Sequence, residues 1–155
     1  MTLPRQLSED GVPRRSLLVI GGAMIISGCV GDDSQLDHGG DITLIIDGSE
    51  FDLSQDQFQA EHADEYAMEF HLHETSDQWY NEGTTQITLA EALDLLPEFE
   101  FETDETGDRL VIEDEVFDSA SENVTISYEV NGEAVDPEAY ELDDGDAILI
   151  SIETE

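Results

Sequence analysis

Short stretches in which hydrophobic and polar residues alternate dominate the chain, a pattern typical of β-strands with one buried face. The apolar run 42–46 is followed by turn residues at 47–49, and Phe51 and Leu53 then alternate with acids. This order predicts a first β-hairpin, in which the second strand is short. Residues 55–65 are polar and show no clear period.

The alternation is strict from Tyr66 to His73, with aromatic or aliphatic residues at every even position. It predicts a strand whose other face carries Glu69, His71 and His73. Trp79-Tyr80 follows after a polar turn, which predicts a second hairpin.

One helix is expected, at about 88–96. Thr88 and Glu91 have the spacing of a capping box, in which each side chain bonds the backbone of the other. Apolar residues then repeat at helical intervals, and Pro97 ends the segment. Because the helix is short, its stability must come from packing of the apolar face.

Strand patterns return after the helix. Phe99 and Phe101 alternate with Glu, a turn follows at 106–108, and the residues 110–112 form the returning strand. A further strand is predicted at 124–130, and Asn131-Gly132 after it is the strongest hairpin signal in the chain. Residues 137–140 are expected to form one helical turn, and 147–152 the last strand.

These elements predict an α+β fold in which one helix packs on a mixed sheet. The order of the last elements resembles the end of β-grasp (ubiquitin-like) domains, and the initial hairpin before a helix fits the same plan with 55–85 inserted. The alternative is a small β-sandwich. We expect a single globular domain at 42–155, with no internal repeat.

The N-terminal part has the pattern of an export signal. Three of the four basic residues precede an uncharged apolar run at 17–28, which is too short to span a bilayer and matches the hydrophobic region of a signal peptide. Arg14-Arg15 before this run resembles a twin-arginine signal. We expect 1–28 to be the signal peptide.

The only Cys of the chain, Cys29, directly follows Ile26-Ser27-Gly28 at the end of the apolar run. Small residues before a Cys at this place resemble a lipobox, which implies that Cys29 receives a lipid and becomes the new N-terminus. The expected location is the extracellular face of the cell membrane, with the lipid as anchor. The Gly- and Asp-rich residues 29–41 are predicted to be a flexible tether.

The charge of the chain is strongly negative. There are 40 Asp and Glu against 4 Lys and Arg among 155 residues, a formal net charge of −36. Such a surface repels itself at ordinary ionic strength, but at ~1 M salt the Debye length is only roughly 3 Å. The composition resembles that of halophilic archaeal proteins. It argues against nucleic acid as a partner and makes any acidic cluster weak evidence for a site.

No catalytic motif is found. The chain has no Lys for Schiff-base or P-loop chemistry, and one Cys excludes a disulfide framework. We therefore expect a domain that binds an unknown protein or small ligand and is not an enzyme. Asn123-Val124-Thr125 has the spacing of a glycosylation site.

The histidines give an alternative function. His71 and His73 at i and i+2 on a strand would present two imidazoles on one face, a pair that binds Cu or Zn when a third donor approaches. His38 and His62 are the candidates for assistance. The simpler interpretation is a polar strand face with two hydrogen-bonded histidines.

The segment 70–82 resembles one found in a group of small exported prokaryotic proteins. These proteins begin with a His-bearing segment and an Ile-x-Ile-x-Gly strand, then show His-x-His, a further His before Glu, and a Thr-Leu-x-x-x-Leu helix. Here His38, the pair His71/His73 and the helix start at Thr88 match these positions. The further His is replaced by Tyr80. The resemblance covers roughly 38–96 and implies a fold and export, because the group has no established activity.

Overall fold

In the computed structural model of the protein, residues 34–155 are described. They contain ten strands, one α-helix and two 3-10 helices: β1 (His38–Ile46), β2 (Ser49–Glu50), η3 (Asp56–Phe58), η4 (Ala60–His62), β3 (His71–Leu72), β4 (Gln78–Asn81), α1 (Leu89–Leu95), β5 (Phe99–Asp104), β6 (Gly107–Ile112), β7 (Glu115–Asp118), β8 (Val124–Val130), β9 (Glu133–Ala134) and β10 (Ala147–Thr154).

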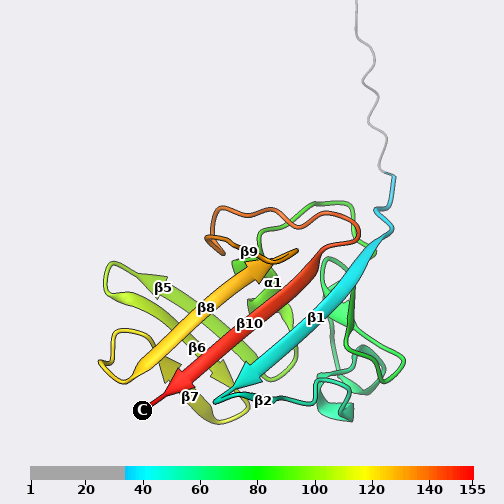
Figure 1. The fold of residues 1–155 in the computed structure, drawn as a ribbon. Coiled ribbons are helices and arrows are strands. Elements are labelled where there is room, and N and C mark those ends of the chain that lie inside the picture. Colours follow the sequence, from blue (N-terminus) through cyan, green and yellow to red (C-terminus); the bar gives the residue numbers. More distant parts are fainter. Residues whose placement is uncertain (1–33) are drawn as a thin grey trace, which may run out of the picture. The chain divides into compact units, whose positions relative to one another are not determined.

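Seven strands form a mixed sheet in the order β3-β4-β1-β10-β8-β9, with β2 paired to β1. The first and last long strands, β1 and β10, run parallel, and the other neighbours are antiparallel. Figure 1 shows β8, β10 and β1 side by side across the molecule, with α1 and the strands β5 to β7 behind them. The fold is therefore α+β, as the sequence predicts.

The strands β5, β6 and β7 form a separate antiparallel sheet. Its aromatic residues join the core of the large sheet, since the ring of Phe101 lies edge-on to that of Tyr128, with 6.2 Å between their centroids. One continuous set of buried side chains includes Trp79 of β4, Leu93 of α1 and Ile150 of β10. Burial of such residues contributes about 1.5–3 kcal/mol each, which holds the short helix in place.

The local signals for the helix and the last hairpin are confirmed. The Thr88 hydroxyl accepts from the backbone N–H of Glu91, and the Glu91 carboxylate accepts from that of Thr88, so both halves of the capping box are present. Asn131 and Gly132 both have positive φ, the conformation that a two-residue hairpin turn requires. The expected helical turn at 137–140 is present as a single turn, in which the Tyr140 N–H donates to the Asp136 carbonyl four residues earlier.

The predicted tether ends earlier than expected, because β1 begins at His38 rather than at Ile42. Residues 38–41 pair with β4, and Gly40 lies against Trp79 opposite it. A Cβ at Gly40 would come within 2.0 Å of the Asp146 carbonyl oxygen. The glycine therefore serves close packing of three segments, and 38–41 belong to the folded domain.

The predicted strand 66–73 is wrong in its first part, because only His71 and Leu72 pair as β3. Phe70 and Leu72 are buried as expected, whereas Tyr66 and Met68 are exposed. β3 lies at the edge of the sheet, where β4 is its neighbouring strand and a single bridge joins Leu72 to Gln59 on the other side, so no strand extends it to residue 66. The pairing of β3 with β4 confirms the second hairpin.

Other differences are smaller. β7 was not expected, and the short β2 ends before Phe51, although Phe51 still donates its N–H to the Leu44 carbonyl. The parallel pair and the helix argue against the alternative of a β-sandwich, which is built from antiparallel sheets.

The signal peptide, Arg14, Arg15 and Cys29 lie outside the described residues. Among residues 34–155, no helix has the length and apolar character that a membrane crossing needs.

Candidate metal centre

The β3–β4 hairpin places the histidine pair beside Tyr80. His71 is the direct cross-strand partner of Tyr80, and residues paired in this way project to the same face of a sheet. The imidazoles of His71 and His73 stack with their centroids 5.5 Å apart. The Tyr80 ring lies 4.1 Å from that of His73, so both imidazoles are held against an aromatic surface.

His71 is buried, with 2% of its surface exposed, and both of its ring nitrogens have partners. Its Nδ1 lies 3.0 Å from the Ala67 carbonyl oxygen, which can only accept, so Nδ1 carries a proton. This leaves Nε2 directed at the Glu82 carboxylate, 2.9 Å away. A neutral ring would place its Nε2 lone pair against the carboxylate, so the contact is stabilised by a second proton or by a cation between the two groups.

Three candidate ligand atoms converge at this point. One atom each of His71, His73 and Glu82 lie within 4.8 Å of one another. They line an open pocket of about 400 Å³ together with Ala60, Glu61, Tyr66 and Glu74. The side chains of Glu82 and His73 are 42% and 29% exposed, so an ion from solvent reaches the group. Two imidazoles and one carboxylate are donors that Zn²⁺, Cu²⁺ and other transition metals accept.

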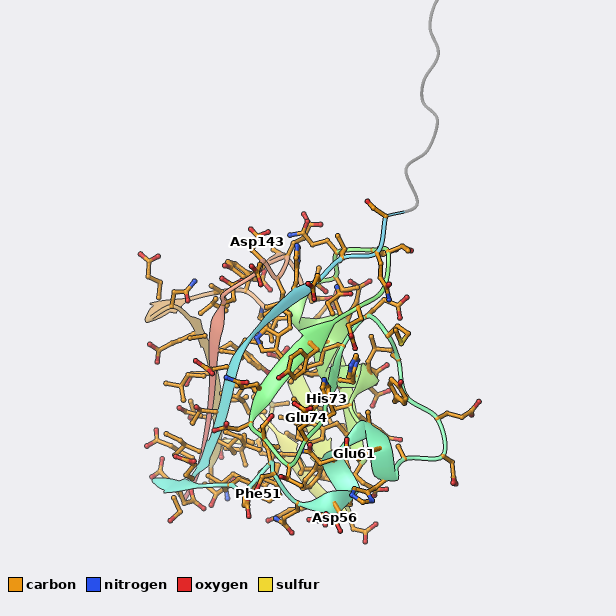
Figure 2. All side chains as sticks on the ribbon, turned by 90° about the vertical axis from the view of Figure 1, so that its right-hand side faces the viewer. Phe51, Asp56, Glu61, His73, Glu74 and Asp143 are labelled. Carbon is orange, nitrogen blue, oxygen red and sulfur yellow. The ribbon has the colours of Figure 1, made fainter. Side chains whose placement is uncertain are left out.

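The rim of the pocket is acidic. Glu61 of η4 accepts the backbone N–H of Glu74 at 2.8 Å, and the Glu74 carboxylate lies 3.9 Å from Nδ1 of His73. The backbone amides of Glu61 itself and of Glu74, with the His62 and His73 rings nearby, hold the pKa of the Glu61 carboxyl below its usual range. Figure 2 shows Glu61, His73 and Glu74 in one region of the molecule. This rim favours cations over anionic ligands.

The structure does not bring His38 or His62 into the group. His38 pairs with Asn81 across β1 and β4, one position along from Tyr80, and therefore projects to the opposite face of the sheet. His62 is on η4 and lies 3.5 Å from the Asp56 carboxylate. Glu69, which the strand pattern placed beside the histidines, packs against the position of Gly83 and is not one of the three ligands.

Glu82 was not expected in the site, although the hairpin contains the signal for it. Once His71 is paired with Tyr80, the period of two along a strand places residue 82 on the same face as Tyr80. The abundance of acids hid this position, because the chain carries 40 Asp and Glu, and most of them cannot be ligands.

Asn123 is exposed just before β8, and its side-chain amide donates to the Glu155 carbonyl at 3.0 Å. The predicted glycosylation site is therefore accessible, but its amide is bound within the protein and must be released before modification.

Searches of protein-family models, of curated proteins and of solved structures find no match to this chain. The function must therefore be argued from the site itself.

Proposed function

We propose that this protein captures a divalent transition metal ion, Cu²⁺ or Zn²⁺, between His71, His73 and Glu82. The observation that carries the proposal is the convergence of three ligand atoms within 4.8 Å in a pocket open to solvent. The role that we propose is binding of the ion, and it includes no reaction.

The support for His71 extends beyond its distance to Glu82. Metal-binding histidines almost always donate the second ring N–H to a carbonyl or carboxylate, which fixes the tautomer and the ring orientation. His71 donates to Ala67 in this way, and its buried ring keeps Nε2 directed at the pocket. The buried ligand is thus oriented before any ion arrives, which lowers the entropic cost of binding.

Calorimetric titration of the full-length chain with Zn²⁺ and with Cu²⁺ tests the proposal. It should be done in molar KCl, where loose binding to the many carboxylates is suppressed by screening. We expect one ion per chain, and at least about 100-fold weaker binding when His71 and His73 are both replaced by Ala, a loss of about 2.8 kcal/mol.

The matched control is the double variant His38→Ala/His62→Ala, which removes the same number of imidazoles away from the site. It should bind like the wild type. Equal binding by the wild type and the His71/His73 variant would contradict metal capture and leave a general interaction domain, whose histidines form only a polar face.

We also propose that the domain is exported and held at the extracellular face of the cell membrane by lipid on Cys29. The twin-arginine pair, the apolar run and the Cys after Gly28 support this location. Cys29→Ser should move the protein from the membrane fraction to the soluble fraction. Replacement of Arg14 and Arg15 by Lys should instead leave precursor inside the cell, so the two steps are separable.

The fold supports a β-grasp assignment at the finer level. The first and last long strands, β1 and β10, are parallel neighbours in the centre of the sheet, and each has an antiparallel partner on its other side. Along the chain, α1 follows β1 to β4 and precedes the remaining strands. In this proposal the sheet β5-β6-β7 and the segment with η3 and η4 are insertions. The proposed metal pocket lies between the segment with η3 and η4 and the sheet edge formed by β3.

A further inference from the structure

Glu61 lines the same pocket as the three ligands but comes from a different element. It lies on η4, whereas His71 is on β3, His73 follows it, and Glu82 follows β4. Figure 2 shows Glu61 on its short helix beside the His73 and Glu74 side chains. A carboxylate at this place approaches the pocket from the side that the sheet leaves open.

One oxygen of the Glu61 carboxylate is held by a hydrogen bond. Its Oε1 accepts the backbone N–H of Glu74, the residue directly after His73, at 2.8 Å. Glu74 and Thr75 both have positive φ, 65° and 52°, so the turn that presents this N–H is a tight and strained one. The hydrogen bond links η4 to the β3–β4 turn and leaves the second oxygen of Glu61 for a cation.

We infer that Glu61 is the fourth ligand, so that two imidazoles and two carboxylates coordinate the metal ion. This inference rests on the proposed metal capture at His71, His73 and Glu82. Glu61 lies outside the group of atoms within 4.8 Å, so its second oxygen moves to the ion by side-chain rotation while the bond to Glu74 remains.

Two other residues of the pocket have side-chain oxygen atoms, Glu74 and Tyr66, and both are less suited to be the fourth ligand. The Glu74 side chain is 77% exposed, so its carboxylate is held in place less firmly than that of Glu61, which accepts a backbone N–H. Tyr66 is a neutral phenol, 48% exposed, and would have to release its proton to solvent on binding. Of these three side chains, Glu61 is the one whose carboxylate accepts a backbone N–H from the turn after His73.

A fourth protein ligand changes the kind of site. Structural sites for zinc-like ions have four protein ligands, whereas catalytic sites have three and keep a position for water or substrate. With Glu61 bound, the ion is cargo or a structural element and has no position for a reacting molecule. The ion also joins η4 to the sheet.

Substitution with Co²⁺ tests this coordination, because four-coordinate Co²⁺ absorbs visible light much more strongly than six-coordinate Co²⁺. The full-length chain in molar potassium nitrate should show the intense bands of four-coordinate Co²⁺. In Glu61→Gln a water molecule should replace the carboxylate, so the positions of the bands should shift, and Co²⁺ should bind about 10–100-fold more weakly, the range that loss of an outer-shell partner already costs.

Glu65→Gln is the matched control, because it removes the same charge at a residue that is exposed and does not line the pocket. It should retain the intense bands. Bands and Co²⁺ affinity that are the same in the wild type and in Glu61→Gln would show that Glu61 is not a ligand and would leave metal capture intact. A change of bands and affinity in Tyr66→Phe but not in Glu61→Gln would show that the phenol is the fourth ligand instead. Absence of Co²⁺ binding in every variant would overturn both proposals.

Discussion

Two buried polar groups lie near β4, and they differ in how their partners are supplied. Asp146 is 4% exposed, and its carboxylate accepts from the Asn131 amide at 2.8 Å, the Asp143 backbone N–H at 2.8 Å and the Tyr140 hydroxyl at 3.1 Å. His71 is 2% exposed, but its Nε2 meets only a half-exposed carboxylate at the wall of a pocket.

The difference separates a structural network from a binding site. Every partner of Asp146 is a donor from the protein, so the network is complete and joins the turns at either end of β9 and before β10. In the His71 group, Nε2 faces the Glu82 carboxylate, which is an acceptor, so the contact needs a proton or a metal cation between the two atoms. The Asp146 network has donors from the protein for this purpose and leaves no place for a cation.

Salt should have the largest effect, because it acts on both regions together. The net charge of −36 repels across the whole surface once screening is removed. Far-UV circular dichroism should show loss of the fold on dialysis from molar KCl to ~0.05 M, where screening extends over more than about 10 Å. A fold unchanged at low salt would contradict the halophilic interpretation.

Gly40→Ala should be the most damaging single substitution in the Asp146 region. The added Cβ would lie 2.0 Å from the Asp146 carbonyl oxygen and 2.8 Å from Nε1 of Trp79, which donates to that oxygen. We expect a loss of about 3 kcal/mol in the free energy of unfolding, measured with denaturant in molar KCl. Gly48→Ala, with nothing within 4 Å of its Cβ, is the control for which only the cost of positive φ remains.

Asp146→Ala should separate stability from binding. It leaves donors of Asn131, Tyr140 and Asp143 without their acceptor, at a cost of about 3 kcal/mol. Its affinity for Zn²⁺ in molar KCl should equal that of the wild type, whereas His71→Ala should lose the affinity. If Asp146→Ala weakened binding as much as His71→Ala, the two regions would not be independent.

Tyr80→His should sharpen the site. The Tyr80 ring is 4.1 Å from that of His73, so an imidazole there would face the same pocket region. We expect about tenfold tighter Zn²⁺ binding, or 1.4 kcal/mol, by calorimetry. Tyr80→Phe, which keeps the ring but adds no ligand, should show no gain, and equal affinities of both variants would count against the geometry.

Alkaline pH should weaken the Asp146 region, and this is the smallest of the expected effects. Burial and the hydrogen bond to Asp146 raise the pKa of Tyr140 above its ordinary value of about 10. The folded state then holds the Tyr140 proton more tightly than the unfolded state. The resulting contribution to the free energy of unfolding is therefore complete below pH ~10 and is lost as the pH rises toward the folded pKa. Tyr140→Phe should cost about 1 kcal/mol at pH 7 and reduce the alkaline loss of unfolding free energy.

Burial also raises the pKa of Tyr128, so Tyr140→Phe should leave part of the alkaline loss in place. An alkaline loss identical in the wild type and in Tyr140→Phe would show that the hydroxyl does not bond Asp146.

The parts of the fold set by neighbours in sequence could be predicted, and the parts set by distant contacts could not. The capping box at Thr88 and the Asn131-Gly132 turn depend on residues within the same segment. The sequence places Gly39-Gly40 in a tether. The structure needs a glycine at Gly40 because Trp79 and Asp146 pack closely against it, and these residues are 39 or more positions away in the sequence.

The site shows the same division. The pair His71/His73 was identified from its spacing, but Glu69 was paired with it through a strand that does not form at residue 69. Glu82 depends on the register of the β3–β4 hairpin, and Glu61 on a hydrogen bond between segments. In a chain with 40 acids, only such geometry distinguishes a ligand carboxylate from the rest.

X-ray absorption at the zinc edge of the Zn²⁺-loaded full-length chain in molar KCl tests the central claim most directly, because it identifies the atoms around the ion. The account predicts two imidazole nitrogens at about 2.0–2.1 Å together with carboxylate oxygen, and loss of the imidazole scattering in His71→Ala/His73→Ala. A shell of oxygen atoms alone, the same in both proteins, would contradict the claim that this pocket captures a metal ion.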